Sequence, residues 1–103
     1  MADQTPDFVM RVSGQKGPGG YINPGKRVLK ENGFVELHGA GAATSVAVIA
    51  AERLISYGYG TLERLETMRL ENSNTSKVVV RLTKATGFDE AEQKWAKEQQ
   101  SSS

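Results

Sequence analysis

A stretch of twelve residues without a charged side chain, Ala40 to Ala51, constrains the fold of this chain more than any other feature. Its alanine, valine and isoleucine content predicts a helix over residues 41–57. A helix without a polar face must be covered on most of its sides. We expect Val48, Ile49 and Ile55 to pack on a sheet. The small residues on the remaining sides then indicate close contact with a second copy or a similar subunit, unless the first helix and the C-terminal segment cover them.

The chain length and the reactive side chains exclude several classes of protein. A chain of 103 residues fits one domain with a modest core. The absence of cysteine excludes a disulfide scaffold, a cysteine zinc site and a thiol nucleophile. His38 is the only imidazole, and the carboxylates form no tight cluster that could replace it in a metal site. No nucleophile, base and oxyanion donor come together in the pattern, so we expect no enzyme, no metal, no cofactor and no small-molecule substrate.

The N-terminus and the apolar segments indicate where in the cell the protein is expected. Residues 1–7 are polar and acidic, unlike a secretory or mitochondrial leader. The longest uncharged apolar stretch, residues 39–51, is shorter than the roughly 20 residues that cross a bilayer. We expect a protein of the cytoplasm, the nucleus or both, without a membrane partner.

Charge is distributed unevenly along the chain. The formal net charge is +1, but residues 1–7 and 87–103 each carry −2 while residues 8–86 carry +5. Residues 8–30 hold five basic side chains and no acidic one. Segregation of this kind indicates a polyanionic partner, since a cationic surface gains affinity by releasing the counterions of phosphates. An ordinary solvated surface is the alternative interpretation.

Strand and helix patterns alternate along the rest of the chain. Alternating apolar residues predict strands at 8–13, 34–38 and 77–83. A first helix passes through residues 26–31, with Asn23 as its N-cap, Pro24 at its first helical position and Gly33 at its end. The spacing in residues 62–71 fits either a helix or a ragged strand, and residues 72–76 fit a hairpin loop.

If residues 62–71 form a strand, the element order is βαβαββ, an α/β fold of the two-layer α+β sandwich type. The domain organisation that follows has a polar tail (residues 1–7), one folded domain (residues 8–85) and a charged C-terminal tail (residues 86–103). We expect this last segment to be partly helical or disordered.

Two glycine-rich segments come close to phosphate-binding motifs. Residues 20–26 satisfy GxxxxGK, but Arg27 stands where a magnesium-binding Ser or Thr is required. Residues 39–44 resemble GxGxxG, but Thr44 replaces the last glycine. A nucleotide-binding fold also needs more strands than this chain holds. The remaining expectation is that a glycine loop and a helix N-terminus offer backbone N–H groups to phosphate oxygens, with flexible linking and tight helix packing as the alternatives.

Several segments, in this order, resemble the Alba family of small chromatin and RNA-binding proteins. Lys16-Gly-Pro18 and Tyr21-Ile-Asn-Pro-Gly-Lys-Arg27 are similar to its Lys-Pro loop and the start of its first helix. Val35-Glu-Leu-His-Gly-Ala-Gly41 is similar to its Val-Glu-Leu segment, and Leu65-Glu-Thr-Met-Arg-Leu-Glu71 to its third strand. The resemblance covers residues 8–90 and assigns residues 62–71 as a strand.

The resemblance implies a homodimer, or a heterodimer with another Alba-like subunit, that binds RNA or DNA through backbone phosphates. It places Lys16 in a phosphate-binding loop, Lys26 and Arg27 as the basic pair of the first helix, and Gly41 at the start of the second. The full set of implied nucleic-acid-binding residues is Gln15, Lys16, Gly17, Tyr21, Asn23, Lys26, Arg27, Gly41, Arg69 and Lys77. Tyr21 has two possible roles: stacking on an unpaired base, or packing in the core.

Two alanines separate this chain from one branch of the family. Ala40 and Ala42 stand where archaeal members carry arginines, and in this they are similar to the eukaryotic members. The implied role is mRNA and translational regulation or chromatin organisation. The alternative is a heterodimerising structural subunit of a ribonucleoprotein particle, as in ribonuclease P/MRP.

Overall fold

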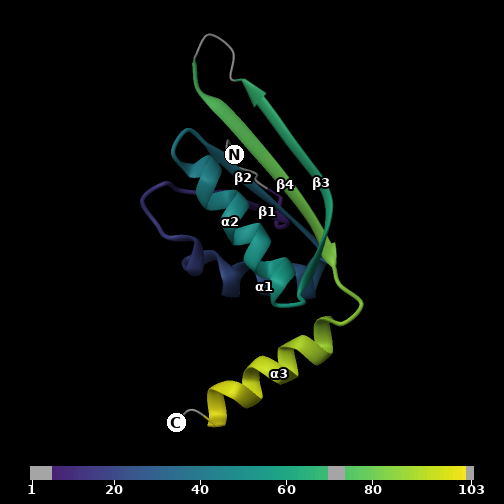
Figure 1. The fold of residues 1–103 in the computed structure, drawn as a ribbon. Coiled ribbons are helices and arrows are strands. Elements are labelled where there is room, and N and C mark those ends of the chain that lie inside the picture. Colours follow the sequence, from purple (N-terminus) through teal and green to yellow (C-terminus); the bar gives the residue numbers. More distant parts are fainter. Residues whose placement is uncertain (1–5, 70–73, 102–103) are drawn as a thin grey trace.

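The computed structural model describes residues 6–69 and 74–101, with side chains as far as Lys94. One four-stranded sheet has the strand order β1-β2-β4-β3, in which β1 and β2 are parallel and the other neighbours antiparallel. Helices α1 and α2 cover one face of this sheet (Figure 1). The elements in chain order are β1 (Val9–Val12), the short 3-10 helix η1 (Pro18–Tyr21), α1 (Ile22–Asn32), β2 (Phe34–Ala40), α2 (Ala43–Ser56), β3 (Gly60–Arg69), β4 (Ser76–Lys84) and α3 (Phe88–Ser101).

The predicted two-layer α+β sandwich is confirmed, and residues 60–69 form a strand. The predicted hairpin loop at residues 72–76 lies partly outside the described residues. Among the residues that the structure describes, no helix combines the length and the apolar character needed to cross a membrane.

Helix α2 packs on the sheet through its small residues. Its buried positions are Ala43, Ala47, Ala50, Ala51 and Leu54, which contact the apolar side chains of β2 and β4. At Gly39, opposite, an added Cβ would overlap the Ala43 carbonyl oxygen, so the helix approaches the strand as closely as glycine permits. Alanine and glycine thus set the spacing between the two layers.

Three of the larger apolar residues of α2 are exposed. The prediction that Val48, Ile49 and Ile55 pack on the sheet is wrong, because these side chains are 37%, 39% and 38% exposed. Close approach requires small side chains at the sheet, and the helical period then turns these three away from it. More than a third of each of these side chains therefore stays open to solvent.

The first helix begins earlier than predicted. Tyr21 precedes α1 in the N-cap position, so the N-cap assignment of Asn23 is wrong. The reason is that η1 runs directly into α1 and supplies its first turn, which leaves Pro24 where its missing N–H is tolerated. The predicted end is confirmed: Gly33 adopts φ 85°, and its N–H donates to the Leu29 carbonyl over 2.9 Å.

The C-terminal segment joins the core at its first residue. Phe88, at the start of α3, is 1% exposed and lies 5.4 Å from the Tyr59 ring, measured between centroids. The Ala91 side chain packs against the same core, beside Gly58. The packed unit therefore extends beyond residue 85, and α3 leaves it at the lower end of the view in Figure 1.

Candidate phosphate-binding surface

Three segments distant in the sequence meet at one end of the sheet. The Gly41 N–H donates to the Ser76 carbonyl over 2.9 Å, which ties the start of α2 to the start of β4. An added Cβ at Gly14 would lie 3.1 Å from the Ala42 Cβ, so the loop after β1 lies against the same helix start. We call residues 14–17 and 41–43, together with Arg53 in the last turn of α2, the loop–helix surface.

The start of α2 has no side-chain cap. Ala42 occupies the N-cap position, and the first turn contains no acidic residue. Gly41 adopts φ 59°, in the left-handed region, and its carbonyl accepts bonds from the Thr44 N–H and the Thr44 hydroxyl at 3.1 and 2.9 Å. The Thr44 N–H is thus already bonded within the turn, whereas the positive end of the helix dipole has no acidic side chain beside it in the first turn and is left to an anion or to solvent.

Lys16 lies over the ring of Tyr21, with its Nζ 4.8 Å from the ring centroid. Tyr21 is only 6% exposed, and its hydroxyl accepts the Ser13 N–H over 2.7 Å. Of the two roles left open for Tyr21, the structure therefore shows packing: the ring anchors the loop and is covered. Gln15 and Gly17 are exposed, and Gly17 has no neighbour within 4 Å of an added Cβ.

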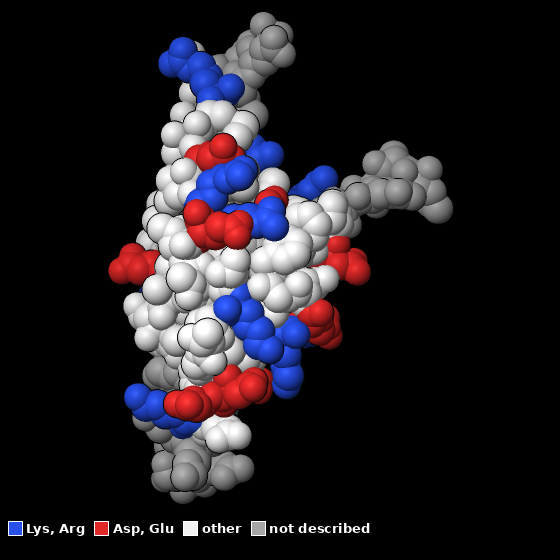
Figure 2. All heavy atoms as spheres, turned by 90° about the vertical axis from the view of Figure 1, so that its right-hand side faces the viewer, with Lys and Arg blue, Asp and Glu red and all other residues white. Residues whose placement is uncertain are grey.

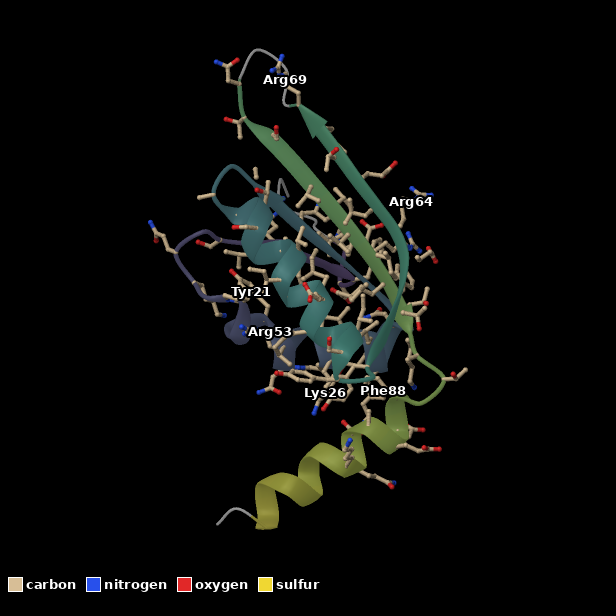
Figure 3. All side chains as sticks on the ribbon, viewed as in Figure 1. Tyr21, Lys26, Arg53, Arg64, Arg69 and Phe88 are labelled. Atoms are coloured by element: carbon tan, nitrogen blue, oxygen red, sulfur yellow. The ribbon has the colours of Figure 1, made fainter. Side chains whose placement is uncertain are left out.

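Arg53 is a candidate that the sequence analysis missed. It is exposed near the end of α2, and its Nη1 would lie 3.7 Å from a Cβ added at Gly19 of η1. A Cβ at Gly20 would overlap the Lys16 side chain, so both cations lie along the backbone of η1. Figure 3 shows Arg53 close to Tyr21. No sequence signal could have identified it, because the helical pattern did not specify which flank of α2 faces η1.

The predicted residues of α1 separate into two groups. Asn23 and Arg27, one helical turn apart, are exposed on the outer side of α1. Lys26 instead lies 5.5 Å from the Tyr59 ring centroid and 3.7 Å from Glu92 Oε2, near Phe88 in Figure 3. Its Nζ is thus directed toward α3 and away from the loop–helix surface.

The two basic residues of the hairpin lie on opposite faces of the sheet. Arg69 pairs with Ser76, and Lys77 pairs with Met68 and Ala40. Cross-strand partners share a face, and successive residues alternate, so Arg69 lies on the face of the helices and Lys77 on the open face. Arg69 marks the end of the hairpin farthest from Lys26 in Figure 3.

The open face carries a network of charges that partner one another. Arg81 Nη1 donates to Glu36 Oε2 over 3.0 Å, and the guanidinium lies 4.2 Å from the Phe34 ring centroid. Arg81 Nε lies 2.9 Å from Glu63 Oε2, the distance of an ion pair but without the angle of a hydrogen bond. This arginine is therefore already occupied by protein groups.

Two groups outside the loop–helix surface have shifted pKa values. The hydrogen bond with His38 and the charges of His38 and Arg81 lower the pKa of Glu36 below 4.5, against the opposing effect of burial. Burial raises the pKa of Tyr59 above 10.0, and the neighbouring Glu92 and Tyr57 act in the same direction. Among the side chains of residues 6–69 and 74–94, no three His, Asp or Glu groups lie closely enough together to hold a metal ion.

Comparison with known proteins adds one result. No protein-family model and no curated protein matches this sequence. A solved structure does match: ALBA1 from Trypanosoma brucei superposes with a TM-score of 0.82, covering 96% of this chain and 88% of that chain at 22% identity. The chain has the Alba fold. The resemblance found in the sequence is thus confirmed at the level of the fold.

The Alba fold of this chain brings together some of the predicted residues and separates others. The loop that bears Gln15, Lys16 and Gly17 reaches the start of α2 beside Gly41 through Gly14, while Arg53 lies beside η1, about 15 Å along α2 from that start. The exposed pair on α1 extends from the loop–helix surface, while Lys26 lies at the α3 end. Arg69 and Lys77 lie on the hairpin strands, on opposite faces of the sheet. Whether each of them contacts nucleic acid stays a prediction.

An apolar surface lies on the opposite flank of α2. Leu62 and Leu65 are 50% and 48% exposed, and their pairing with Leu82 and Val80 puts them on the helix face of β3. Val48 and Ile55, two turns apart on α2, are exposed as well. Figure 2 shows continuous uncharged surface below the interleaved charges of the β3 side. We call Val48, Ile55, Leu62 and Leu65 the apolar surface.

Proposed function

We propose that this chain binds RNA or DNA through backbone phosphates at the loop–helix surface. The observation that carries the proposal is the uncapped start of α2 lying against the loop that bears Lys16. Backbone N–H groups and the helix dipole favour an anion there, and the ammonium and guanidinium groups along η1 add two positive charges. Binding, and not catalysis, is the proposed role.

The proposed mode of binding is electrostatic, with little reading of base sequence. Phosphate contacts position a protein on nucleic acid but carry no sequence information themselves. Arg27 and Asn23 on α1, and Arg69 and Lys77 on the hairpin, are the candidates for contacts to neighbouring phosphates. Such a protein suits mRNA and translational regulation or chromatin organisation, in the cytoplasm, the nucleus or both.

The apolar surface supports a proposed dimer. Four exposed aliphatic side chains on adjacent elements form a patch of the kind that marks a protein–protein contact. A second copy of this chain, or another Alba-like subunit, would bury it and would also cover the outer side of α2. Two loop–helix surfaces in one particle would then contact the same nucleic acid.

A second candidate function is that of a heterodimerising structural subunit of a ribonucleoprotein particle. Ala40 and Ala42 beside Gly41 favour it, because two exposed alanines add no charge to the helix start. In that case the apolar surface carries the function and the loop–helix surface binds weakly. A stable homodimer of the pure protein, measured by sedimentation, would argue for the first candidate.

Binding titrations test the proposal directly. We would titrate labelled single-stranded RNA and duplex DNA at 50 and 200 mM salt with the wild type, with K16E/R53E, and with R64E/K94E. Arg64 and Lys94 are exposed and lie away from the loop–helix surface, so the second variant matches the charge change.

The expected result is salt-sensitive binding that K16E/R53E weakens by about tenfold or more at 50 mM salt, as the loss of two phosphate contacts requires. R64E/K94E should weaken it far less. Equal losses in both variants would show that only net charge matters, and a folded wild type that binds neither ligand at 50 mM would overturn the proposal.

A further inference from the structure

One acidic residue of α3 lies between two lysines of α1. Lys26 and Lys30 are one helical turn apart, and their Nζ atoms lie 3.7 and 3.4 Å from the two carboxylate oxygens of Glu92. A single carboxylate flanked by two ammonium groups leaves one positive charge uncompensated. Two lysines around one anion are also an arrangement that suits a phosphate group.

The packing of α3 on the core positions the Glu92 carboxylate without help from the ion pairs. Phe88, one turn before Glu92, is buried against Tyr59. The Ala85 N–H donates to the Tyr59 carbonyl over 3.0 Å, which fixes the chain just before α3. Glu92 is therefore presented to the lysines whether or not it is charged.

The contacts between Glu92 and the lysines are loose. Charge-assisted N–H···O bonds are usually about 2.7–2.9 Å long, whereas the two distances here are 3.7 and 3.4 Å. The Lys30 side chain is 56% exposed, whereas those of Lys26 and Glu92 are 28% and 30% exposed. All three remain in contact with solvent, and ion pairs that solvent and salt can reach are weak, so a nucleic-acid phosphate can compete for the two ammonium groups.

Lys30 also continues the polar and cationic side of α1 that begins near the loop–helix surface. Asn23, Arg27 and Lys30 follow one another at helical spacing along the exposed side of α1, which starts directly after η1. A nucleic-acid backbone bound at the loop could therefore continue along this side of α1 and reach Lys30.

We propose that Lys26 and Lys30 form a further phosphate-binding site, and that the Glu92 carboxylate occupies it in the free protein. This inference rests on the proposed function and adds a regulation to it. The C-terminal helix sets how many phosphates the chain binds, because its carboxylate and the nucleic acid compete for the same pair of lysines.

The test compares two variants with the same change of charge. E92Q removes the competing carboxylate, whereas E90Q removes an exposed one on the other side of α3. Both are titrated with labelled duplex DNA and single-stranded RNA at 50 and 200 mM salt beside the wild type. A third variant, K26M/K30M/E92Q, removes the site itself.

We expect E92Q to bind more tightly than E90Q at 50 mM salt. Its loss of duplex affinity between 50 and 200 mM should exceed that of E90Q by about threefold for one added phosphate contact and about tenfold for two. The triple variant should lose this gain. Circular dichroism should show all three folded, because Phe88 is retained.

The outcomes separate this inference from the proposed function. If the wild type binds in a salt-sensitive manner while E92Q and E90Q behave alike, the masking of the lysines is refuted and the loop–helix proposal stands. If neither the wild type nor E92Q binds at 50 mM salt, both proposals fail. If the gain of E92Q survives in the triple variant, it does not arise from Lys26 and Lys30, and the inference is refuted.

Discussion

The cationic side chains beside the two ends of α1 have different partners. At the η1 end, Lys16 lies on a tyrosine ring, and no described acidic side chain lies within ion-pair distance of it or of Arg53. At the α3 end, Lys26 and Lys30 share the carboxylate of Glu92. A count of basic residues in the sequence does not distinguish the η1 end of α1 from its α3 end. The comparison shows that the availability of a cation depends on which segment is packed beside it.

The largest expected effect comes from removing the residue that holds α3 in place. Phe88→Ala empties a site in the core and should reduce the free energy of unfolding by about 3–5 kcal/mol. Urea denaturation measures this loss, with the exposed Asp89→Ala as its control. If the variant remains folded, its Lys26 should be as free to bind a phosphate as Lys16 is. A loss below about 1 kcal/mol would show that α3 is not anchored by Phe88.

An intermediate effect is expected at the start of α2. Gly41→Ala forces a side chain into the left-handed region, which should cost about 1–2 kcal/mol of stability and disturb the loop–helix surface. Gly17→Ala is the matched control, since Gly17 has φ −67° and open space around it. Thermal unfolding of both variants is the measurement. Equal midpoints would show that the backbone conformation at Gly41 contributes nothing.

The smallest expected effect on stability concerns Glu36, the carboxylate that pairs with Arg81. The pKa of Glu36 is lowered on folding, so its contribution to stability is complete above pH 4.5 and is lost as the pH falls through the folded-state pKa. Glu36→Gln should therefore be less stable at pH 7, and should lose less stability between pH 5 and pH 3 than the wild type. Urea midpoints at pH 7, 5 and 3 measure this, with the exposed Glu66→Gln as control. A parallel decline of wild type and E36Q would contradict it.

The sequence predicted the element order and the ends that depend on local chemistry. Gly33 ends α1 in the left-handed conformation because a glycine after a helical pattern meets no steric penalty there. Alternation of apolar residues was sufficient for β2 and β4. The expectation that α2 is covered on most of its sides stays a prediction, because Val48 and Ile55 on its outer side are exposed in the single chain.

Features that depend on contacts between distant segments could not be predicted. Which side of α2 meets the sheet is decided by how closely Ala43 can approach Gly39, and a hydrophobic pattern favours the larger residues instead. The N-cap prediction at Asn23 failed because η1 replaces the cap. The partner of Lys26 lies far along the chain in α3, so nothing near it in the sequence indicated Glu92.

The order of strands in the sheet also has a kinetic consequence. The two central strands, β2 and β4, pair with each other from Phe34↔Thr83 to Ala40↔Lys77, although all of α2 and β3 lie between them in the chain. The β3–β4 hairpin can close locally, within about 1–10 μs, whereas the central pair must first close a long loop. Folding of this domain should therefore be limited by that late central pairing, as in other topologies rich in non-local contacts. Substitutions within β2 should slow folding more than they accelerate unfolding.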